Sequence, residues 1–497
     1  MQQADICLLL EGTYPYVRGG VSSWVHQLIS GLPQYSFYLV FLGGTKESYG
    51  EQRYTLPANV VGLETHFIMQ HEQFSPPRGR MGKARAFDMW QQVLARFNRV
   101  DDALNSEQLQ LMLQQLGLQQ GLSYEDFLYS EYSWQILVEQ YLQQAPDQSF
   151  VDFFWTFRNI YTPLFSLVKI ARKVPPARML HSISTGYAGF LGALLKQRLD
   201  VPYLLSEHGI YTKERKIDLT QASWIQDRHF VLDTSIHKKM EHTRQTWISF
   251  FEQLGKTAYQ HANHITALYQ GNRERQITDG APAEKTEIIV NGINLSRFAP
   301  ALQQRPASPP KVVGLIGRVV PIKDIKTFIR AIRVAVNTEP SLEGWIIGPT
   351  DEDPTYVKEC QLLIDSLSLQ SQVKFLGMQD VAQILPQLGV CMLTSISEAQ
   401  PLVLLEAMAA GVPCIATDVG SCREIIEGMQ EQDKALGPCG YVIGIANPNQ
   451  ASQAILNILS DEQHWHRMSQ AGYARVNQYY QEHIMFTRYQ QLYESLI

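Results

Sequence analysis

The chain has few cysteines, and none of them is spaced as metal ligands are. Several of the six lie inside apolar runs that predict buried strands. This usage is typical of reduced thiols in a cytoplasmic protein and indicates neither a disulfide framework nor a zinc site. The cysteines are Cys7, Cys360, Cys391, Cys414, Cys422 and Cys439.

Long apolar runs and a strong charge of either sign are also lacking. No stretch of about 18 uncharged apolar residues occurs, so the sequence predicts no membrane span. The run Ile6–Leu10 is short and follows Asp5, which favours a first buried strand over a signal peptide. The formal net charge is −6, so bulk attraction to nucleic acid is not expected. The chain shows no internal repeats.

The length of 497 residues is too great for one ordinary core and favours two domains. From Lys311 onward, short apolar runs alternate with amphipathic helices, which predicts a parallel sheet covered on both faces. The expected strands are 312–316, 345–347, 373–376, 390–393 and 413–416, and the expected helices are 325–336, 356–367, 381–387 and 402–410.

The first half repeats this alternation less regularly. A glycine loop leads from the first strand into a helix at 21–30, and further strands are expected at 37–41, 179–182, 203–205 and 264–268. Proline-rich residues 299–310 predict the domain boundary. Residues from about 81 to 170 interrupt the alternation and predict a helical insertion. A subdomain covering the sheet is favoured over a docking surface for a partner, because an aromatic stripe is more often core.

Two glutamates eight positions apart, Glu398 and Glu406, are the most informative feature. An apolar strand precedes Glu398, while Glu406 lies on the following helix, whose first turn begins at Pro401 and Leu402. Free N–H groups at a helix start favour phosphate, and carboxylates accept hydrogen bonds from hydroxyls. The pattern fits a sugar attached to a nucleotide. The alternative is that both glutamates merely favour the helix dipole.

Two cations follow the first strand of the second half. Arg318 offers a planar fork and Lys323 a point charge, and together they suit a diphosphate. A lysine near a helix start is also common without any ligand. Residues 351–353, Asp-Glu-Asp, superficially match a metal-binding motif, but they precede Pro354 at a helix start, where acidic residues are frequent. We therefore expect no metal cofactor.

Residues 394–413 resemble the donor-site motif of retaining glycosyltransferase family 4, which fixes two glutamates, small helix residues and a Gly-x-Pro exit together. The chain has Gln400 and Pro401 where many members carry Phe-Gly. Arg318 and Lys323 resemble the phosphate pair of the family. Other matches are a base-holding loop at Gly377-Met378, a glycine loop at Arg18-Gly19-Gly20 that faces acceptor and phosphates, His208 near the donor sugar, and a hinge at Asn291-Gly292.

The resemblance implies an α/β GT-B architecture, in which two Rossmann-like, doubly wound domains face a cleft. It places the acceptor-side domain at 1–298, the nucleotide-sugar domain at 299–482 and a helix crossing back at 483–497. It also implies residue roles. Arg318 and Lys323 would stabilise the diphosphate, Glu406 would hold the ribose, and Glu398 and His208 would act on the donor sugar.

The opening residues and the insertion resemble, more narrowly, a cytoplasmic glycosyltransferase of bacterial exopolysaccharide assembly. This implies a UDP-glucose-like donor, a polysaccharide acceptor, inner-membrane protein partners and no nucleic acid. Two other functions fit a similar fold: a UDP-sugar epimerase and a catalytically silent nucleotide-sugar sensor. An epimerase would need more acid and base groups than Glu207 and His208 supply.

Overall fold

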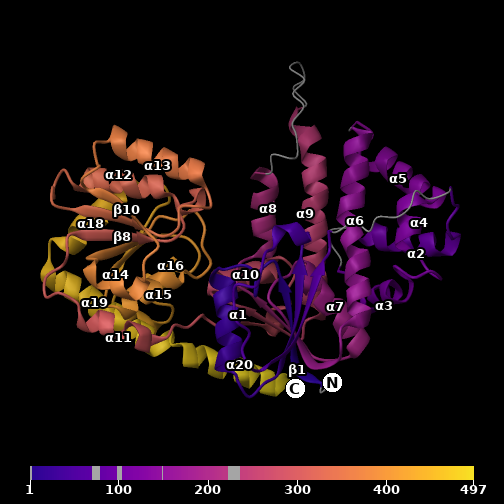
Figure 1. Ribbon diagram of the computed structural model, residues 1–497, viewed down its shortest axis with the longest axis horizontal. Coiled ribbons are helices and arrows are strands. Elements are labelled where there is room, and N and C mark those ends of the chain that lie inside the picture. Colours follow the sequence, from indigo (N-terminus) through magenta and orange to yellow (C-terminus); the bar gives the residue numbers. More distant parts are fainter. Residues whose placement is uncertain (1–2, 70–78, 98–102, 148, 222–235) are drawn as a thin grey trace. The chain divides into compact units, whose positions relative to one another are not determined.

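The computed structural model describes residues 3–69, 79–97, 103–147, 149–221 and 236–497. The chain forms two compact units (Figure 1). Unit 1 contains Met1–Ala267, Arg273–Glu287 and Gln490–Ile497, and unit 2 contains Leu268–Asn272 and Ile288–Tyr489. Each unit is built around its own parallel sheet, which confirms the expected α/β class with two Rossmann-like domains.

The sheet of unit 1 has seven strands in the order β3-β2-β1-β4-β5-β6-β7. The central strands pair in parallel. They are buried along most of their length, because the apolar residues of β1 and β4 are covered on both faces of the sheet. The strands are β1 (Ala4–Glu11), β2 (Phe37–Gly43), β3 (Val60–Phe67), β4 (Ala177–Ser182), β5 (Tyr203–Glu207), β6 (His264–Ala267) and β7 (Thr286–Ile288).

Helix α7 (Tyr187–Leu199) packs on β1 and β4, and the helices of the expected insertion pack outward from it (Figure 1). These are α2 (Ala84–Phe97), α3 (Ser106–Gln115), α4 (Tyr124–Tyr129), α5 (Glu131–Gln144) and α6 (Phe150–Lys173). Their apolar faces join one core with α7 and α9 (Ile236–His261). The insertion therefore extends the core of unit 1. Unit 1 also contains α1 (Gly20–Gly31), α8 (Tyr211–Gln221) and part of α10 (Gln270–Thr278).

The sheet of unit 2 has six strands in the order β10-β9-β8-β11-β12-β13. They are β8 (Val312–Ile316), β9 (Glu343–Ile347), β10 (Val373–Gly377), β11 (Val390–Leu393), β12 (Cys414–Thr417) and β13 (Gly440–Ile443). The helices of this unit include α12 (Ile325–Ala335), α13 (Pro354–Ser366), α14 (Val381–Ile384), α15 (Leu402–Ala409), α16 (Cys422–Glu427), α18 (Pro448–Leu459) and α19 (Glu462–Tyr479), of which α12, α15, α16 and α18 pack on the sheet.

The boundary between the units differs from the expected one at 298/299. The continuous part of unit 2 begins at Ile288, and the expected linker 299–310 begins inside helix α11 (Leu295–Gln303). Two contacts explain the shift. Phe298 is buried in the core of unit 2, and the Ile293 N–H donates to the Tyr480 carbonyl at 2.9 Å. The proline-rich residues therefore lie in and after helix α11, within unit 2, and the chain passes between the units before that helix.

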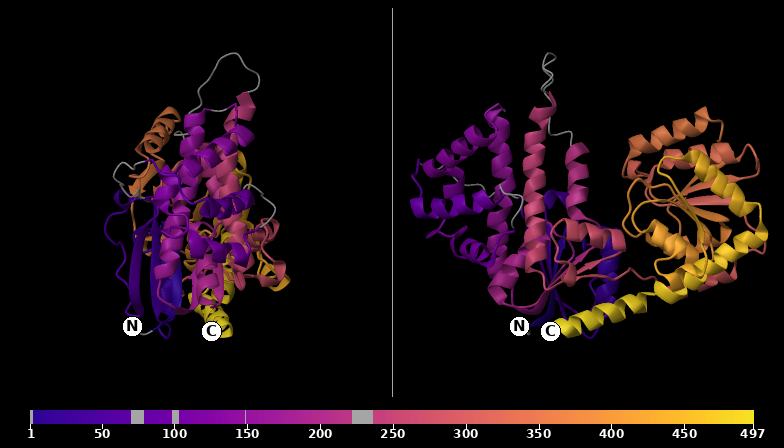
Figure 2. Two further views of the ribbon diagram at one scale, coloured as in Figure 1. Left: turned by 90° about the vertical axis from the view of Figure 1, so that its right-hand side faces the viewer. Right: turned by 180° about the vertical axis from the view of Figure 1, so that it is seen from behind.

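Helix α20 (Glu482–Leu496) begins in unit 2, and its last residues belong to unit 1 (Figure 2). Tyr493 is fully buried, and its hydroxyl lies 2.8 Å from Nδ1 of His181 on β4. The other ring nitrogen of His181 lies 2.8 Å from the Ser206 hydroxyl. Burial lowers the pKa of His181 to about 3, so the ring is neutral at neutral pH and bonds to the Tyr493 hydroxyl near the end of α20.

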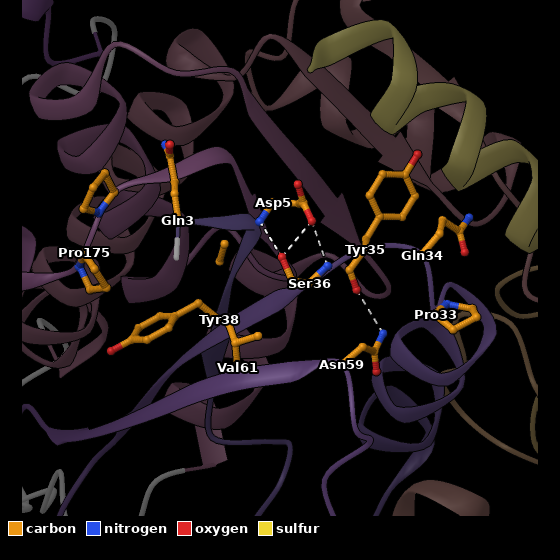
Figure 3. Close-up of a pocket in the computed structure, with 12 residues that line it drawn as sticks. Gln3, Asp5, Pro33, Gln34, Tyr35, Ser36, Tyr38, Asn59, Val61 and Pro175 are labelled. Carbon is orange, nitrogen blue, oxygen red and sulfur yellow. Dashed lines mark hydrogen bonds between the residues drawn. The ribbon is translucent and has the colours of Figure 1, made fainter. Parts of the chain in front are cut away.

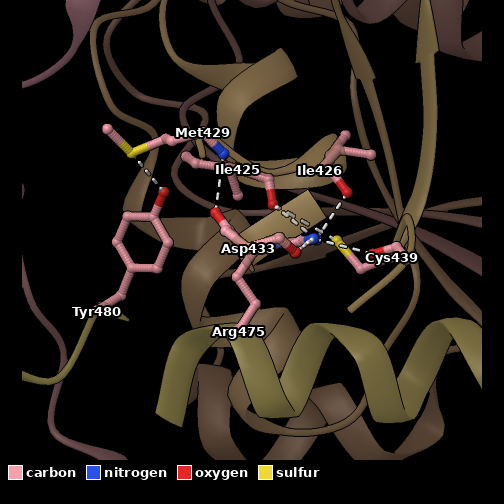
Figure 4. Close-up of polar contacts among 8 residues, drawn as sticks. Ile425, Ile426, Met429, Asp433, Cys439, Arg475 and Tyr480 are labelled. Carbon is pink, nitrogen blue, oxygen red and sulfur yellow. Dashed lines mark hydrogen bonds and ion pairs between the residues drawn. The ribbon is translucent and has the colours of Figure 1, made fainter. Parts of the chain in front are cut away.

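A buried ion pair holds α19 against the segments before β13 (Figure 4). The Arg475 Nε donates to Asp433 Oδ1 at 2.5 Å, and both side chains are almost fully buried. The guanidinium also donates to the carbonyls of Ile426 and Gly437, while the second Asp433 oxygen accepts from the Met429 N–H. Because all these groups are satisfied, the pair tolerates burial.

Replacing Arg475 by leucine should lower the free energy of unfolding of unit 2 by about 3–5 kcal/mol, because Asp433 would be left charged and buried. Urea denaturation followed by circular dichroism measures this. The matched control is Arg467→Leu on the exposed side of α19, which should change stability by less than about 0.5 kcal/mol. Equal losses in the two variants would contradict the assignment.

Candidate functional site

The loops after β8 and β11 meet at a topological switch point in unit 2. The chain runs from β8 outward through β9 to β10, then returns to place β11 on the other side of β8. In open parallel sheets, the carboxyl ends of strands at such a point form the usual ligand site. The expected donor residues Arg318, Lys323 and Glu398 all come from these two loops.

Lys323 and Glu398 form the centre of this site. The Lys323 Nζ lies 2.5 Å from Glu398 Oε1, and the side chains are 18% and 14% exposed. The same carboxylate oxygen accepts a hydrogen bond from the Ser395 hydroxyl at 2.6 Å. The Thr394 hydroxyl donates to the Lys323 carbonyl at 2.8 Å, so the backbones of the two loops are tied together as well. The ammonium of Lys323 and the carboxylate of Glu398 are therefore held together in a site with little access to solvent.

Gly420 holds the Glu398 loop from the other side. Its φ is +57°, a region that favours glycine, and an added Cβ would lie 2.4 Å from the carbonyl oxygens of Glu398 and Ala399. The Ser421 N–H donates to the Ala399 carbonyl at 2.8 Å. The backbone around Glu398 is thus held by hydrogen bonds to two neighbouring segments, the one that follows β8 and the one that follows β12.

Helix α15 begins beside this centre, with Pro401 at its N-cap and Leu402 as its first residue. The first-turn amides of such a helix carry partial positive charge and lack acceptors within the helix. Glu406 lies one turn further; its backbone carbonyl accepts from the Ala410 N–H at 3.1 Å, while its carboxylate has no hydrogen-bond partner among the residues that the structure describes. Burial raises the pKa of Glu406 to about 7, although Arg297 opposes this rise. The group is therefore poised between its two protonation states near neutral pH.

Arg318 is the more exposed of the two expected phosphate-binding cations. Its Nη1 donates to both oxygens of Glu352, at 2.6 and 2.7 Å, and the side chains are 56% and 49% exposed. Asp353 caps helix α13 by accepting from the Tyr356 N–H at 2.9 Å. Two of the three acidic residues at 351–353 therefore already have partners of their own.

Large apolar side chains are exposed in three of the loops that follow strands of unit 2. Met378 follows Gly377 at the end of β10 and is 71% exposed, and an added Cβ at Gly377 would meet no atom within 4 Å. Ile322 and Ile396 are joined by a backbone hydrogen bond of 2.9 Å and are also exposed. The sequence pointed to Gly377 and Met378, but it gave no signal for the isoleucines, whose exposure depends on the loop geometry.

Gln400 occupies a structural position that the sequence did not reveal. Its Oε1 accepts a hydrogen bond of 2.7 Å from the N–H of Asn291, and both side chains are buried. Gly292 next to Asn291 packs against the backbone of residues 481 and 482, where an added Cβ would be 2.5 Å from the Glu482 Cα. The loop before α15 is thus linked to the segment that enters unit 2.

Unit 1 has its own switch point, between β1 and β4. Glu11 at the end of β1 accepts from the Tyr211 hydroxyl at 2.6 Å and from the Ala188 N–H at 3.0 Å. Arg18 and Gly19 follow in the same loop, Gly20 begins α1, and all three are exposed; an added Cβ at either glycine would meet nothing within 4 Å. The glycine loop is therefore open, and its own fold does not demand glycine there.

His208 follows β5 and lies against Trp24 of α1, with ring centroids 4.2 Å apart. It is 7% exposed, so little of the ring meets solvent. The preceding Glu207 is a buried carboxylate with four donors, among them the Tyr259 hydroxyl at 2.6 Å and the Thr185 hydroxyl at 2.8 Å. Burial raises the pKa of Glu207, while these hydrogen bonds oppose the rise. Glu207 thus organises the loop that carries His208.

A hollow of about 400 Å³ lies at the amino ends of the strands of unit 1, opposite the carboxyl ends that carry Glu11 and Glu207 (Figure 3). Asp5, Ser36 and Tyr35 line it at the amino ends of the strands, where parallel folds do not build ligand sites. Asp5 is already satisfied by the backbone and side chain of Ser36 and by Arg178. This hollow is separate from the expected site residues.

Neither a metal-binding cluster nor a membrane-spanning helix is present in the part of the chain that the structure describes. No cluster of three or more His, Cys, Asp or Glu side chains is arranged to hold a metal ion. No described helix is both long enough and apolar enough to cross a bilayer.

The two Rossmann-like domains give the chain the GT-B fold, which it shares with solved structures that align over 99% of its length. The chain belongs to the family described as "Domain of unknown function (DUF3492)", whose model matches residues 4–284. Residues 301–475 match "Glycosyl transferases group 1" and form a domain of that type.

HepE of Anabaena, solved in complex with UDP and glucose, is 16% identical with a TM-score of 0.59, and the alignment covers 99% of this chain and 100% of that chain. A sucrose-phosphate synthase of Thermosynechococcus elongatus is 17% identical with a TM-score of 0.59, covering 99% of each chain. N-acetyl-alpha-D-glucosaminyl L-malate synthase of Bacillus anthracis is 28% identical over 35% of this chain and 43% of its own length. The chain spans less than half the length of that relative.

The raised pKa of Glu406 predicts a pH dependence of stability. Between its ordinary value of 4.5 and about 7, the unfolded state loses the Glu406 proton while the folded state keeps it, so stability falls as pH rises and levels off above 7. Glu406→Gln removes this loss. From pH 5 to pH 8, urea denaturation should show the variant gaining about 2–3 kcal/mol relative to the unsubstituted protein. The exposed control Glu431→Gln should gain nothing; a parallel pH response in all three proteins would contradict the burial of Glu406.

Proposed function

We propose that the protein is a retaining glycosyltransferase that uses a UDP-sugar donor bound at the switch point of unit 2. The observation that carries this proposal is the Lys323–Glu398 pair beside the start of α15, with Glu406 one turn along that helix. Cations, open helix amides and carboxylates at one sheet edge match the diphosphate and hydroxyls of such a donor. The match of residues 301–475 to "Glycosyl transferases group 1" supports the same conclusion.

The diphosphate would exchange partners with the carboxylates. Arg318 is bound to Glu352, and Lys323 to Glu398, so both cations are balanced by acids of the protein. A diphosphate offers each cation a stronger, doubly charged partner, and its arrival would release Glu398 toward the sugar hydroxyls. The exposed Arg318 pair costs little to open, because surface ion pairs contribute at most about 1 kcal/mol.

In the transfer step, the acceptor hydroxyl attacks the anomeric carbon from the side of the leaving diphosphate. The bond from that carbon to the phosphate oxygen breaks, and the acceptor proton passes to the departing phosphate. Arg318, Lys323 and the α15 amides would stabilise the charge that develops on the leaving group. Glu398 and His208 would hold the sugar, while Glu406 would bind the ribose. Attack on the leaving-group side retains the anomeric configuration.

The glycine loop of unit 1 supports a place for the acceptor and the donor phosphates, because Gly19 and Gly20 leave open space beside exposed Arg18. By resemblance of the first domain, we assign the protein to the PelF type of enzyme, which builds Pel exopolysaccharide of bacterial biofilms. This assignment includes a UDP-glucose-like donor, a growing polysaccharide as acceptor, and a cytoplasmic location beside inner-membrane proteins of the same machinery.

One experiment separates this proposal from the two alternatives. The full chain is incubated with UDP-glucose, UDP-galactose or the corresponding N-acetyl sugars, with and without oligosaccharide acceptors. A glycosyltransferase releases UDP with an acceptor and lengthens it, an epimerase converts the donor without UDP release, and a sensor does neither while still binding UDP. Formation of the inverted linkage, read by nuclear magnetic resonance, would refute retention.

Glu398→Gln and Glu406→Gln should fail in different ways. Glu398 touches the reacting sugar, so its change should lower kcat by about one to two decades, the worth of a charge-assisted hydrogen bond. Because Lys323 loses its carboxylate partner, free UDP should bind at least as tightly as before. Glu406 holds a part that does not react, so its change should mainly raise KM for the donor.

Steady-state kinetics and calorimetric titration of UDP test this difference, with Glu431→Gln as the exposed control that leaves all values unchanged. Loss of UDP binding in Glu398→Gln, together with an unchanged donor KM in Glu406→Gln, would require the two roles to be exchanged.

Activity should survive chelation, because Arg318 and Lys323 supply the positive charge that a metal ion provides in other enzymes. UDP release in excess EDTA should stay within about twofold of the untreated rate, a change too small to represent loss of a charge that is worth several kcal/mol. Inactivation that Mg²⁺ or Mn²⁺ reverses would instead assign a metal to the acidic residues at 351–353.

A further inference from the structure

Helices α5 and α6 present large apolar side chains to solvent. Exposed fractions are 48% for Trp134, 57% for Trp155, 60% for Val151 and 61% for Leu142. Together with the half-buried Phe150 and Phe154, these residues are named the α5–α6 aromatic face. The two helices pack against each other within the insertion of unit 1 (Figure 1).

The face is continuous across both helices. The Trp134 ring on α5 lies 5.5 Å from Phe150 and 6.5 Å from Phe154 on α6, and Phe154 lies 5.2 Å from Trp155. Trp134 and Leu142 are two helical turns apart, and Val151 and Trp155 are one turn apart, so each pair shares a side of its helix.

These side chains are additional to those that stabilise the insertion. The core-facing sides of the helices are supplied by other residues, Leu137 on α5 and Phe153 and Phe157 on α6, all buried. Exposed aromatic residues gathered in one patch mark an interaction site in soluble proteins. The insertion thus has a complete core and a second apolar face outside it.

The exposed charged side chains of α5 and of the first two turns of α6 are all acidic, whereas the buried guanidinium of Arg158 lies 5.3 Å from the centre of the Phe154 ring. Residues 124–157 contain six Asp and Glu residues and no Lys, Arg or His. Arg80 neutralises two of the six, Glu125 and Asp126. The other four, Glu131, Glu139, Asp147 and Asp152, are exposed, and none forms an ion pair with a residue in the described ranges.

We propose that the α5–α6 aromatic face binds an amphipathic helix of a partner protein that carries Lys and Arg beside an apolar stripe. Aromatic side chains supply the central contacts of such interfaces, and a helix laid across two neighbouring helices buries them in one groove. The four carboxylates set the sign of the partner. They repel an anionic membrane surface, and they disfavour a two-fold dimer because that symmetry would place acid against acid.

The binding test uses the full chain and a fluorescein-labelled synthetic helix with leucines at positions i, i+3, i+4 and i+7 and lysines on both flanks. Fluorescence anisotropy should show saturable binding that weakens as salt is raised. The same helix with glutamate in place of lysine should bind at least about tenfold more weakly, since like charges meet. Equal binding of the two helices would overturn the proposal, as would no binding of the lysine helix.

Variants assign the binding to this face. Trp134→Gln and Trp155→Gln should each weaken binding about tenfold or more, because each substitution removes one of the two aromatic anchors. Glu139→Lys should weaken it severalfold and reduce the salt dependence. The controls are Leu362→Gln, an exposed leucine on α13, and Asp88→Lys, an exposed acid on α2 of the same insertion. Circular dichroism verifies that each variant is folded. Losses in the controls equal to those in the tryptophan variants would refute the assignment.

Two further measurements test the other occupants. Flotation with vesicles of neutral and of anionic lipid should leave the protein unbound, and sedimentation should give a mass that Trp134→Gln and Trp155→Gln do not change. Vesicle binding abolished by the tryptophan variants would make the face a lipid-binding surface. Dimers dissociated by the same variants would make it a contact between copies of this chain.

Discussion

In unit 2, β8 and β11 lie side by side although two strands separate them along the chain, and the candidate site depends on this adjacency. The connections after these strands leave in opposite directions, so a gap opens at their carboxyl ends. The Thr394 hydroxyl and the Ile396 N–H tie the two loops together by donating to backbone carbonyls of the loop that follows β8. In the same two loops, the side chains of Lys323 and Glu398 form an ion pair.

The charges of the site are balanced within the protein itself. Lys323 is held by Glu398 in a mostly buried pair, Arg318 by Glu352 on the surface, and Glu406 is favoured in its neutral form by burial. An empty anion site with two free cations would be destabilised by their repulsion. Internal partners remove that cost, and they also set a threshold, because a ligand must bind each cation more strongly than the carboxylate that it replaces.

The strands expected from the sequence were mostly central ones, and the three that were missed all lie at sheet edges: β3, β7 and β13. A strand buried on both faces is a continuous apolar run, whereas an edge strand mixes polar residues and is short, as β7 is. The domain boundary predicted from the prolines lies too far along the chain, because Pro300 is inside α11 and the packing of Phe298 ties this helix to unit 2. The helical insertion was visible from the loss of strand alternation alone.

The sequence by itself determined which chemical groups stand at the ends of which elements. Glu398 follows an apolar strand, Glu406 lies one turn into a helix, and Arg318 and Lys323 follow another strand, all of which local periodicity reveals. The tertiary structure decided which partner each group has. Glu352 reaches Arg318 across 34 positions, Lys323 reaches Glu398 across 75, and Tyr493 reaches His181 across 312. Periodicity reports burial over one or two turns, whereas partners at these separations are set by the order of strands in a sheet, which no local pattern encodes.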